Sequence, residues 1–383
     1  MHAINEFVVK IASRCNLNCD YCYEYNMGDD SWKKQSKYMT EETANQLKNR
    51  IVEHLKAHPE IDQIFISYHG GEPLSTGPER MQDYCDIFRK ICDETPVRLS
   101  FSTQTNGVFL DEEMINVLKR NRVYVGISVD GPKQYNDLHR LDHKGNSTFS
   151  GTQKGIEKMN ALAKEYFNSV FAVIDLRIPP LEVFDYFGSI GVSNCDFLLP
   201  HYNWDKLPPR YNKSEVAYGE WLYEIWQAWI NGRNKHLNIR FLESIVRNFL
   251  GAESLYEAMT DAPASLITIN ADGDYEGVDT LKSTGNSSQV IGYNVYDNTL
   301  DQVLLHQAVQ QRQIGIKALC QKCLDCQHLK RCYGGYYPHR FKKINGFNNE
   351  SVYCNDLYYL ISKMREDLIK FKKLKENADI INH

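Results

Sequence analysis

The strongest constraint on the fold is the regular alternation of short β-rich runs with helix-length amphipathic segments over about the first 200 residues. This pattern predicts strands at Phe7–Ile11, Gln63–Tyr68, Arg98–Gln104, Tyr124–Ser128, Val170–Ile174 and Cys195–Leu199. It predicts helices between them near Thr40–His58, Pro78–Thr95, Asp111–Asn121, Gly151–Tyr166 and Pro180–Ile190. Because right-handed crossovers join such units, we expect an α/β fold with six parallel strands in a partial (β/α)6 barrel or an open sheet.

In both arrangements reactive groups belong at the carboxyl ends of the strands, and unusual residues follow the first four predicted strands. Cys15 follows the first strand, and the run His69–Pro73 follows the second. The run 105–107 (Thr-Asn-Gly) follows the third strand, and 130–132 (Asp-Gly-Pro) follows the fourth. We therefore expect these motifs to share one site.

Length and charge exclude several classes of protein. A chain of 383 residues that is 42% hydrophobic can bury a large core, and its length suits one large domain with a smaller one. The net charge is -5 and the basic residues are dispersed, so nucleic acid is not expected as a partner. No apolar run approaches the roughly 20 residues of a membrane span, and no signal peptide is evident, so we expect a cytoplasmic location.

The eleven cysteines are unevenly placed. Three lie near the start (Cys15, Cys19 and Cys22) and five lie near the end (Cys320, Cys323, Cys326, Cys332 and Cys354). So many cysteines in a reducing compartment indicate metal binding for the two groups. The remaining three stand alone in segments that read as core, and we expect buried, inert thiols at Cys85, Cys92 and Cys195.

The first cysteine group has the spacing CxxxCxxC in a polar loop after a strand. Three thiolates can hold three irons of a cubane and leave the fourth iron open to an exogenous ligand. Such an iron can chelate S-adenosylmethionine (SAM), whose sulfonium bond a reduced cluster can break to give a 5′-deoxyadenosyl radical. The alternative, structural zinc, requires a fourth ligand that is not found nearby in the sequence.

This loop resembles that of the radical SAM superfamily, and the resemblance assigns further residues to SAM. Tyr21 corresponds to an aromatic residue that lies against the adenine, with loop packing as the alternative. Gly70, Gly71 and Glu72 resemble the GGEP motif that meets the amino group of SAM, with a plain turn as the alternative. The resemblance also implies SAM contacts for Gln104, Asn106, Ser128 and Arg140, and a solvated side chain is the alternative for Arg140.

The second group supplies four thiolates, Cys323, Cys326, Cys332 and Cys354, which suit a fully ligated 4Fe-4S cluster. A zinc ribbon is the alternative. The spacing is similar to the outer cluster of SPASM domains, but other cysteines of that family are missing, so one auxiliary cluster is expected and a second is doubtful. Cys320 is left over as an exchangeable ligand or a free thiol.

Three segments are expected along the chain: a radical SAM core over 1–212, a helical bridge over 213–264, and a SPASM-like or twitch-like auxiliary-cluster domain with a C-terminal helix over 265–383. In the last segment, residues 272–279 resemble a SPASM run in which a cysteine is replaced here by Val278. The aspartate of that run is retained as Asp279, our candidate for the base that takes a proton from the substrate, with a capped turn as its alternative. Asp205 and Asp356 are weaker candidates.

The most particular resemblance lies near the C-terminus. Residues 334–341 (GGYYPHRF) and 345–357 (NGFNNESVYCNDL) are similar to a signature of cyclophane-forming radical SAM/SPASM peptide maturases. The resemblance implies an oxidoreductase that crosslinks an aromatic ring carbon to a β-carbon within three-residue motifs of a ribosomally synthesised precursor peptide. It also implies SAM, 4Fe-4S clusters, and an electron donor such as flavodoxin or ferredoxin.

Other functions stay open at this point. One is formylglycine formation, as in anaerobic sulfatase maturases, which needs a Cys or Ser target. Another is a thioether-forming maturase, which needs Cys in the precursor. A more distant alternative is a non-catalytic iron-sulfur or zinc scaffold or sensor. No separate leader-binding domain is evident before the first strand, so leader recognition is expected to use the core folds or a partner.

Overall fold

The computed structural model describes residues 2–254, 256–285 and 287–381, with side chains up to Phe371. By packing, the chain divides into two units, each assembled from separate stretches of sequence. The first unit comprises Met1–Ala172, Ser189–Cys195 and Ala262–Ile314, and the second comprises Val173–Gly188, Asp196–Asp261 and Gly315–His383. The predicted segments 1–212, 213–264 and 265–383 do not coincide with these two units, and as functional domains they remain predictions.

The six predicted strands are present, with ends that shift by three residues at most. They are β1 (Glu6–Ala12), β2 (Gln63–Gly70), β3 (Arg98–Thr105), β4 (Val123–Ser128), β5 (Phe167–Val173) and β6 (Asn194–Leu198). Strands β1 to β5 pair in chain order, and every pair is parallel. Many of their apolar side chains are fully buried, among them Val9, Ile66 and Ile127, whereas Phe65 and Tyr124 are exposed.

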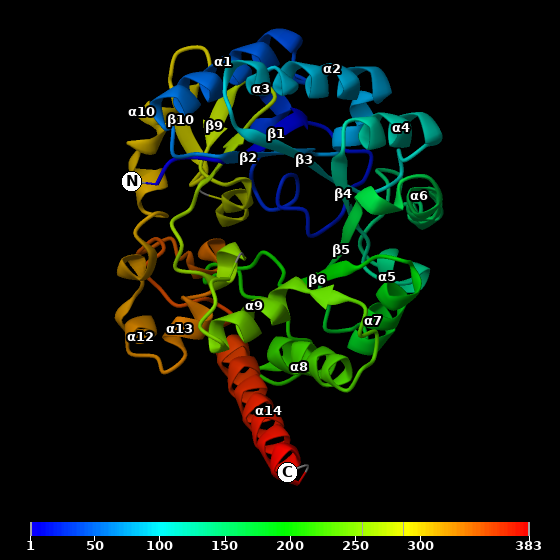
Figure 1. Ribbon diagram of the computed structural model, residues 1–383, viewed down its shortest axis with the longest axis vertical. Helices are drawn as coiled ribbons and strands as arrows, with labels where there is room; N and C mark the ends of the chain where they lie inside the picture. The colour runs from blue at the N-terminus through cyan, green and yellow to red at the C-terminus, as the bar shows by residue number, and fades with distance from the viewer. Residues whose placement is uncertain (1, 255, 286, 382–383) are drawn as a thin grey trace. The chain divides into compact units, whose positions relative to one another are not determined.

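Helices connect these strands and lie along the outside of β1–β4 (Figure 1). In the first unit they are α1 (Glu41–Ala57), α2 (Pro78–Arg89), α3 (Ile91–Glu94), α4 (Glu112–Arg120), α5 (Lys133–Asn136) and α6 (Phe149–Leu162). Local chemistry fixes where they begin: Thr40 accepts the amide of Thr43 ahead of α1, and Asp111 accepts the amide of Met114 ahead of α4. The helix predicted over 78–95 is divided into α2 and α3 at Lys90.

Residues 262–314 extend the sheet of the first unit. Strand β8 (Leu266–Ile269) pairs in parallel with β1, and β9 (Asp274–Glu276) and β10 (Val290–Asn294) follow as antiparallel neighbours. The turn between β8 and β9 uses Gly273 at a φ of 89°, a left-handed conformation that glycine adopts without strain. The short helices α10 (Leu300–Leu304) and α11 (Gln307–Gln310) complete this part. This pairing brings a segment from late in the sequence to the edge of β1.

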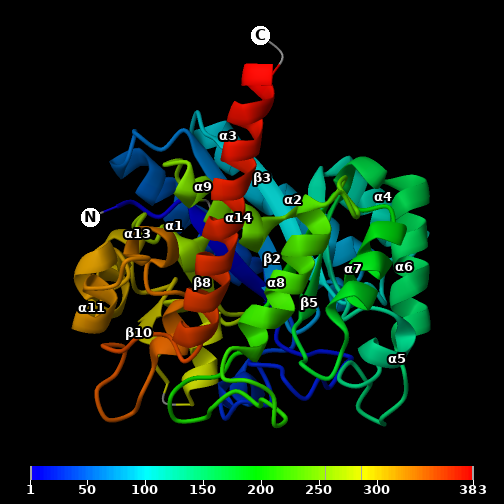
Figure 2. The ribbon, with the colours of Figure 1, turned by 90° about the horizontal axis from the view of Figure 1, so that it is seen from below.

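The second unit is mostly helical. It contains α7 (Pro180–Ser189, with its last residue in the first unit), α8 (Ala217–Ile230), α9 (Arg240–Phe249), α12 (Gln321–Leu324), α13 (Leu329–Cys332), α14 (Cys354–Ile381) and the short strand β7 (Asn238–Ile239). The helix predicted near 243–259 ends at Phe249, because Gly251 has a left-handed φ of 74°. Helix α14 packs along α8 (Figure 2), with the rings of Tyr218 and Tyr353 5.1 Å apart. In the described part of the chain, no helix combines the length and apolar character needed to cross a membrane.

Candidate active site and iron-sulfur sites

The first cysteine group lies in the loop directly after β1. The backbone folds tightly there, since the amide of Cys22 donates to the carbonyl of Cys19 at 3.0 Å. The amide of Leu17 donates to Sγ of Cys15 at 3.4 Å. Burial raises the pKa of all three thiols, and raises that of Cys22 to about 12. Buried thiols of this kind become thiolates only when a metal compensates their charge.

At least two of the three thiols of the first group lie more than 4.8 Å apart. A tetrahedral zinc site holds its sulfur ligands about 3.8 Å apart, because each Zn–S bond is about 2.3 Å. In the described part of the chain, one group of metal-binding side chains has three ligand atoms within 4.8 Å of one another. That group contains no cysteine, so the three thiols are not spaced for a single zinc ion. The all-thiol donor set of Cys15, Cys19 and Cys22 is therefore suited to a 4Fe-4S cluster with one open iron.

Gly70 and Gly71, which resemble part of a SAM-binding motif, are required by the packing of the chain itself. Gly70 has a φ of 123°, and a Cβ there would lie 1.9 Å from the carbonyl oxygen of Ala12. A Cβ on Gly71 would lie 2.0 Å from the hydroxyl of Tyr25 and 2.5 Å from the carbonyl of Arg14. The two glycines thus let the end of β2 press against the loop that carries the cysteines.

The carboxylate of Glu72 ties the ends of β2 and β3 together. It accepts the hydroxyl of Thr105 at 2.7 Å and the amides of Asn106 and Leu74 at 2.8 and 3.0 Å. Burial raises its pKa and these three donors oppose the rise. Glu72 therefore holds the strand ends in place, and its predicted contact with the amino group of SAM remains a proposal.

Three other residues assigned to SAM, Gln104, Asn106 and Ser128, lie at or just after the ends of the third and fourth strands. Gln104 donates from Nε2 to the hydroxyl of Ser128 at 2.7 Å. Asn106 donates to the side-chain oxygen of Asn16 at 2.8 Å, and its Nδ2 lies 3.9 Å from Sγ of Cys15. The end of β3 is thereby linked to the cysteine loop, as the shared-site prediction requires.

Tyr21 forms one group with Arg140 and Asp130, whose side chains are buried. The hydroxyl of Tyr21 donates to Oδ2 of Asp130 at 2.5 Å and accepts from Arg140 at 2.8 Å. Burial alone would lower the pKa of Arg140, but Tyr21, Cys19 and Asp130 hold it well above the usual value. Arg140 is thus a buried cation beside the first cysteine group, not a solvated side chain, and its proposed SAM partner is anionic.

Asp279 lies at the edge of this site, in the turn after β9. Its Oδ2 accepts the hydroxyl of Tyr23 at 2.9 Å and lies 3.5 Å from Nδ1 of His69 and 4.0 Å from Nζ of Lys10. Burial alone would raise the pKa of Asp279, but Lys10 and the other neighbours hold it below the usual range. Asp279 is therefore an ionised carboxylate close to the cysteine loop, as a base requires.

Sequence reasoning missed the buried ionic network behind Asp279. Lys10 donates to Glu24 at 2.5 Å and to Glu276 at 3.1 Å, and Lys282 donates to Glu24 at 2.9 Å. Both lysines are almost completely buried. A signal was present, since Lys10 interrupts the apolar run of the first strand.

The cysteines of the second group lie before, within and just after α12 (Cys320, Cys323 and Cys326), at the end of α13 (Cys332) and at the start of α14 (Cys354). Cys320 and Cys323 are hydrogen-bonded through their thiols, and burial raises the pKa of Cys323. Burial also raises the pKa of Cys332 to about 12, with Cys354 and Cys326 as close neighbours. The donors predicted for an auxiliary cluster are thus brought together, with Cys320 beside them.

Arg340 lies buried near the second cysteine group. Its side chain is buried, and its Nε and Nη1 atoms make no hydrogen bond among the described residues. The groups whose charge it feels most are the phenol of Tyr337 and the thiols of Cys323, Cys332 and Cys320. Buried guanidinium N–H groups without a hydrogen-bond acceptor are unfavourable, so the site fits an anionic thiolate-ligated cluster.

The weaker candidates for the base have other roles in the second unit. Asp205 is exposed and accepts the amide of Lys343 at 2.7 Å. Asp356 is buried, pairs with Arg210 at 2.7 Å and accepts the amide of Tyr218 at 2.9 Å.

Among the isolated cysteines, Cys85 and Cys195 are buried, but Cys92 is exposed. The prediction of a buried Cys92 is wrong, because α3 is one short turn that leaves this side chain on the outside.

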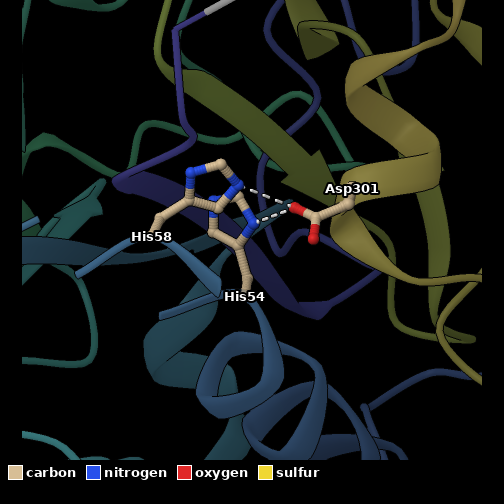
Figure 3. A group of neighbouring side chains, drawn as sticks. All are labelled: His54, His58 and Asp301. Carbon is tan, nitrogen blue, oxygen red and sulfur yellow. Dashed lines mark hydrogen bonds and ion pairs between the residues drawn. The ribbon is translucent and has the colours of Figure 1, made fainter. Parts of the chain in front are cut away.

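His54, His58 and Asp301 form the group with metal-ligand spacing noted above (Figure 3). Nε2 of His54 accepts the amide of Ile4 at 3.2 Å, so the proton of the neutral ring lies on Nδ1 and is donated to Asp301 at 2.6 Å. His58 also contacts Asp301, at 3.1 Å. These hydrogen bonds account for the close spacing of the three side chains. If Nδ1 of His54 bound a metal, the proton of the neutral ring would lie on Nε2, which could then no longer accept the buried amide of Ile4.

Comparison with known proteins agrees with this geometry. Residues 9–175 match the family profile of the Radical SAM superfamily. A cysteine-type anaerobic sulfatase-maturating enzyme of Clostridium perfringens is 23% identical over 370 residues, which are 92% of this chain and 94% of that protein.

Two solved structures are similar to this chain over most of its length. Native anSMEcpe with bound AdoMet aligns with a TM-score of 0.82 and 21% identity over 96% of this chain and 98% of that chain. Streptococcus suis SuiB bound to precursor peptide SuiA aligns with a TM-score of 0.60 and 16% identity, over 92% of this chain and 76% of that chain. These likenesses establish the fold alone, an α/β core followed by a C-terminal extension.

Proposed function

We propose that this chain is a radical SAM maturase that oxidises a side chain of a peptide or protein, and the match of residues 9–175 to the Radical SAM superfamily supports this. The reaction that we favour is the conversion of a Cys or Ser side chain to formylglycine. The main support is the similarity to a cysteine-type anaerobic sulfatase-maturating enzyme over 92% of this chain. This order reverses the one that the sequence favoured, in which cyclophane formation came first.

The residues present define what each part of the site would hold. Cys15, Cys19 and Cys22 would hold a 4Fe-4S cluster, and Arg140, Asn106 and the Gln104–Ser128 pair would surround SAM. When bound, the cluster and SAM supply reductive cleavage of the sulfonium bond, and with it a carbon radical that can take a hydrogen atom. The chain itself orients the reactants and removes a proton.

The proton step belongs to Asp279. After one hydrogen atom leaves the substrate β-carbon, the S–H or O–H proton passes to Asp279, and one electron passes to a one-electron acceptor. The C–S or C–O bond thereby becomes a double bond. A serine gives the aldehyde directly, whereas a cysteine gives a thioaldehyde that water converts to the aldehyde with release of H2S. The second cysteine group would hold an iron-sulfur cluster suited to accept the electron.

Cyclophane formation is the second candidate, and the runs 334–341 and 345–357 favour it. The two candidates share the removal of a hydrogen atom, a proton and an electron. They differ in what happens to the β-carbon radical, which here would attack an aromatic ring of the same three-residue motif. The proton that Asp279 takes would then come from the ring carbon.

The test uses the full chain reconstituted under anaerobic conditions with iron, sulfide, SAM and a chemical reductant. Three synthetic peptides are compared: one with a single Cys, one with Ser in its place, and one with an aromatic-x-Asn motif and neither Cys nor Ser. Mass spectrometry measures the mass change, and a hydrazide probe detects an aldehyde. A Cys15→Ala variant of the enzyme is the control.

Formylglycine formation predicts hydrazide labelling of the Cys or Ser peptide and no change in the aromatic peptide. Crosslinking predicts that the aromatic peptide loses two hydrogens, does not react with hydrazide and resists fragmentation inside its motif. A thioether would appear as loss of two hydrogens and of the free thiol in the Cys peptide. SAM cleavage without any peptide product would contradict the proposed function.

A further inference from the structure

Arg340 presents a buried positive charge to the second cysteine group. It follows Pro338 and His339 in a single turn, and its guanidinium lies 4.9 Å from the centre of the Tyr337 ring. A Cβ built on Gly334 would lie 3.6 Å from Nη1 of Arg340, so the glycine after Cys332 gives this side chain room.

Two donor atoms of Arg340 lack an acceptor among the described residues. Nε and Nη1 are buried and make no hydrogen bond within the part of the chain that the structure describes. Burial lowers the pKa of Arg340, and the groups that oppose this fall most are Tyr337, Cys323, Cys332 and Cys320, none of which is a carboxylate. An arginine buried in this way calls for an anionic acceptor of N–H hydrogen bonds.

We propose that Arg340 donates hydrogen bonds to the sulfur atoms of the 4Fe-4S cluster held by the second cysteine group, and thereby raises the reduction potential of that cluster. An added electron makes the cluster one unit more negative, and a fixed cation that donates to its sulfurs stabilises this state more than the oxidised one.

The proposal gives the second cysteine group a role in the maturase reaction, and in that respect it rests on the proposed function. Oxidation of the substrate requires an acceptor for one electron. A cluster with a raised potential accepts that electron more readily, and Arg340 is the residue that sets the potential.

The experiment uses the full chain with Cys15, Cys19 and Cys22 replaced by Ala, so that the second cysteine group is the remaining cluster site. In this background Arg340→Met removes the charge and the donors, and Arg340→Lys keeps the charge but loses the planar fork. Arg365→Met is the matched control, since Arg365 is an exposed arginine of the same unit. Each protein is reconstituted with iron and sulfide, and its midpoint potential is measured by redox titration monitored by electron paramagnetic resonance.

Arg340→Met should shift the midpoint potential to a more negative value, Arg340→Lys should shift it less, and Arg365→Met should leave it unchanged. An unchanged potential in Arg340→Met at full cluster content would overturn the proposal. No peptide is used, so this outcome is independent of whether the proposed oxidation of a peptide is correct.

Thermal unfolding of the same proteins gives a second readout. Before reconstitution, Arg340→Met should unfold at a higher temperature than its parent, because an unpaired buried charge has been removed. After reconstitution this advantage should vanish or reverse. If Arg340→Met takes up no cluster, the comparison before reconstitution decides, and an unfolding temperature below that of the parent would show a purely structural arginine and refute the proposal.

Discussion

The hydroxyl of Tyr23 donates a 2.9 Å hydrogen bond to Oδ2 of Asp279. Tyr23 directly follows the third cysteine of the first group, whereas Asp279 lies in the turn after β9. The contact fixes the candidate base beside the loop where the radical would be generated. It also supplies one of the interactions that keep Asp279 ionised.

Asp279→Asn should separate SAM cleavage from product formation. The amide cannot take a proton, so modified peptide should fall about 100-fold or more while deoxyadenosine formation continues. Tyr23→Phe is the matched comparison, because it removes the hydrogen bond and leaves the carboxylate. Chromatography of the same reactions measures the ratio of modified peptide to deoxyadenosine. A ratio in Asp279→Asn equal to that of the wild type would exclude Asp279 as the base.

Lys10→Met should strongly destabilise the protein, because Glu24, Glu276 and Asp279 lose their shared buried cation. Breaking a buried ion pair on one side costs about 3–5 kcal/mol. Urea unfolding at neutral pH measures the change in the free energy of unfolding. Lys33→Met is the control, since Lys33 pairs with Asp30 on the surface and its loss should have no measurable effect.

The same network predicts how the protein responds to acid. Burial alone would raise the pKa values of Glu24 and Asp279, but Lys10 lowers both. A lowered carboxyl pKa gives stability that is present above the unfolded value of about 4 and is lost as pH falls through the folded value. Asp279 therefore stays ionised across neutral pH, and the ratio of modified peptide to deoxyadenosine should not change in that range. A decline between about pH 8 and pH 6 would show that another group titrates in this step.

His54 predicts a separate acid effect at milder pH. Burial lowers its pKa, and the hydrogen bond to Asp301 opposes this only in part. Unfolded chains then bind a proton below about pH 6.5 that folded chains do not, so the free energy of unfolding should fall as pH decreases from there. Urea titrations at several pH values should show a shallower slope in His54→Leu than in the wild type. An unchanged slope would assign the acid effect to other groups.

Iron analysis should separate Cys320 from the other cysteines of its group. Cys323, Cys326, Cys332 and Cys354 already supply the four thiolates of a complete cluster. Cys326→Ser should therefore lose the iron of one cluster, while Cys320→Ser should keep the iron content of the wild type. A loss of iron in Cys320→Ser would place Cys320 among the ligands.

Local sequence determined much of this protein. Alternating β-rich and amphipathic segments predicted six strands and the helices between them, because burial on a sheet imposes this pattern. The cysteine spacings predict two iron-sulfur sites, since the candidate ligands of each lie mostly within a few turns of chain, and the assignment of these ligands stays a prediction. The motifs at the strand ends predicted a shared site, which the contacts of Asn106 with Asn16 and Cys15 bear out.

Tertiary structure decided the rest, because it depends on contacts between segments that are distant in sequence. Asp279 was expected in a separate C-terminal segment, but the pairing of β8 with β1 carries it to the side of Lys10. That pairing creates the buried network of two lysines and three carboxylates, which no local pattern specifies. Burial likewise leaves Nε and Nη1 of Arg340 without an acceptor in the part of the second unit that the structure describes. The chemistry of these residues depends on desolvation and on opposite charges from other elements, and only the folded chain brings these together.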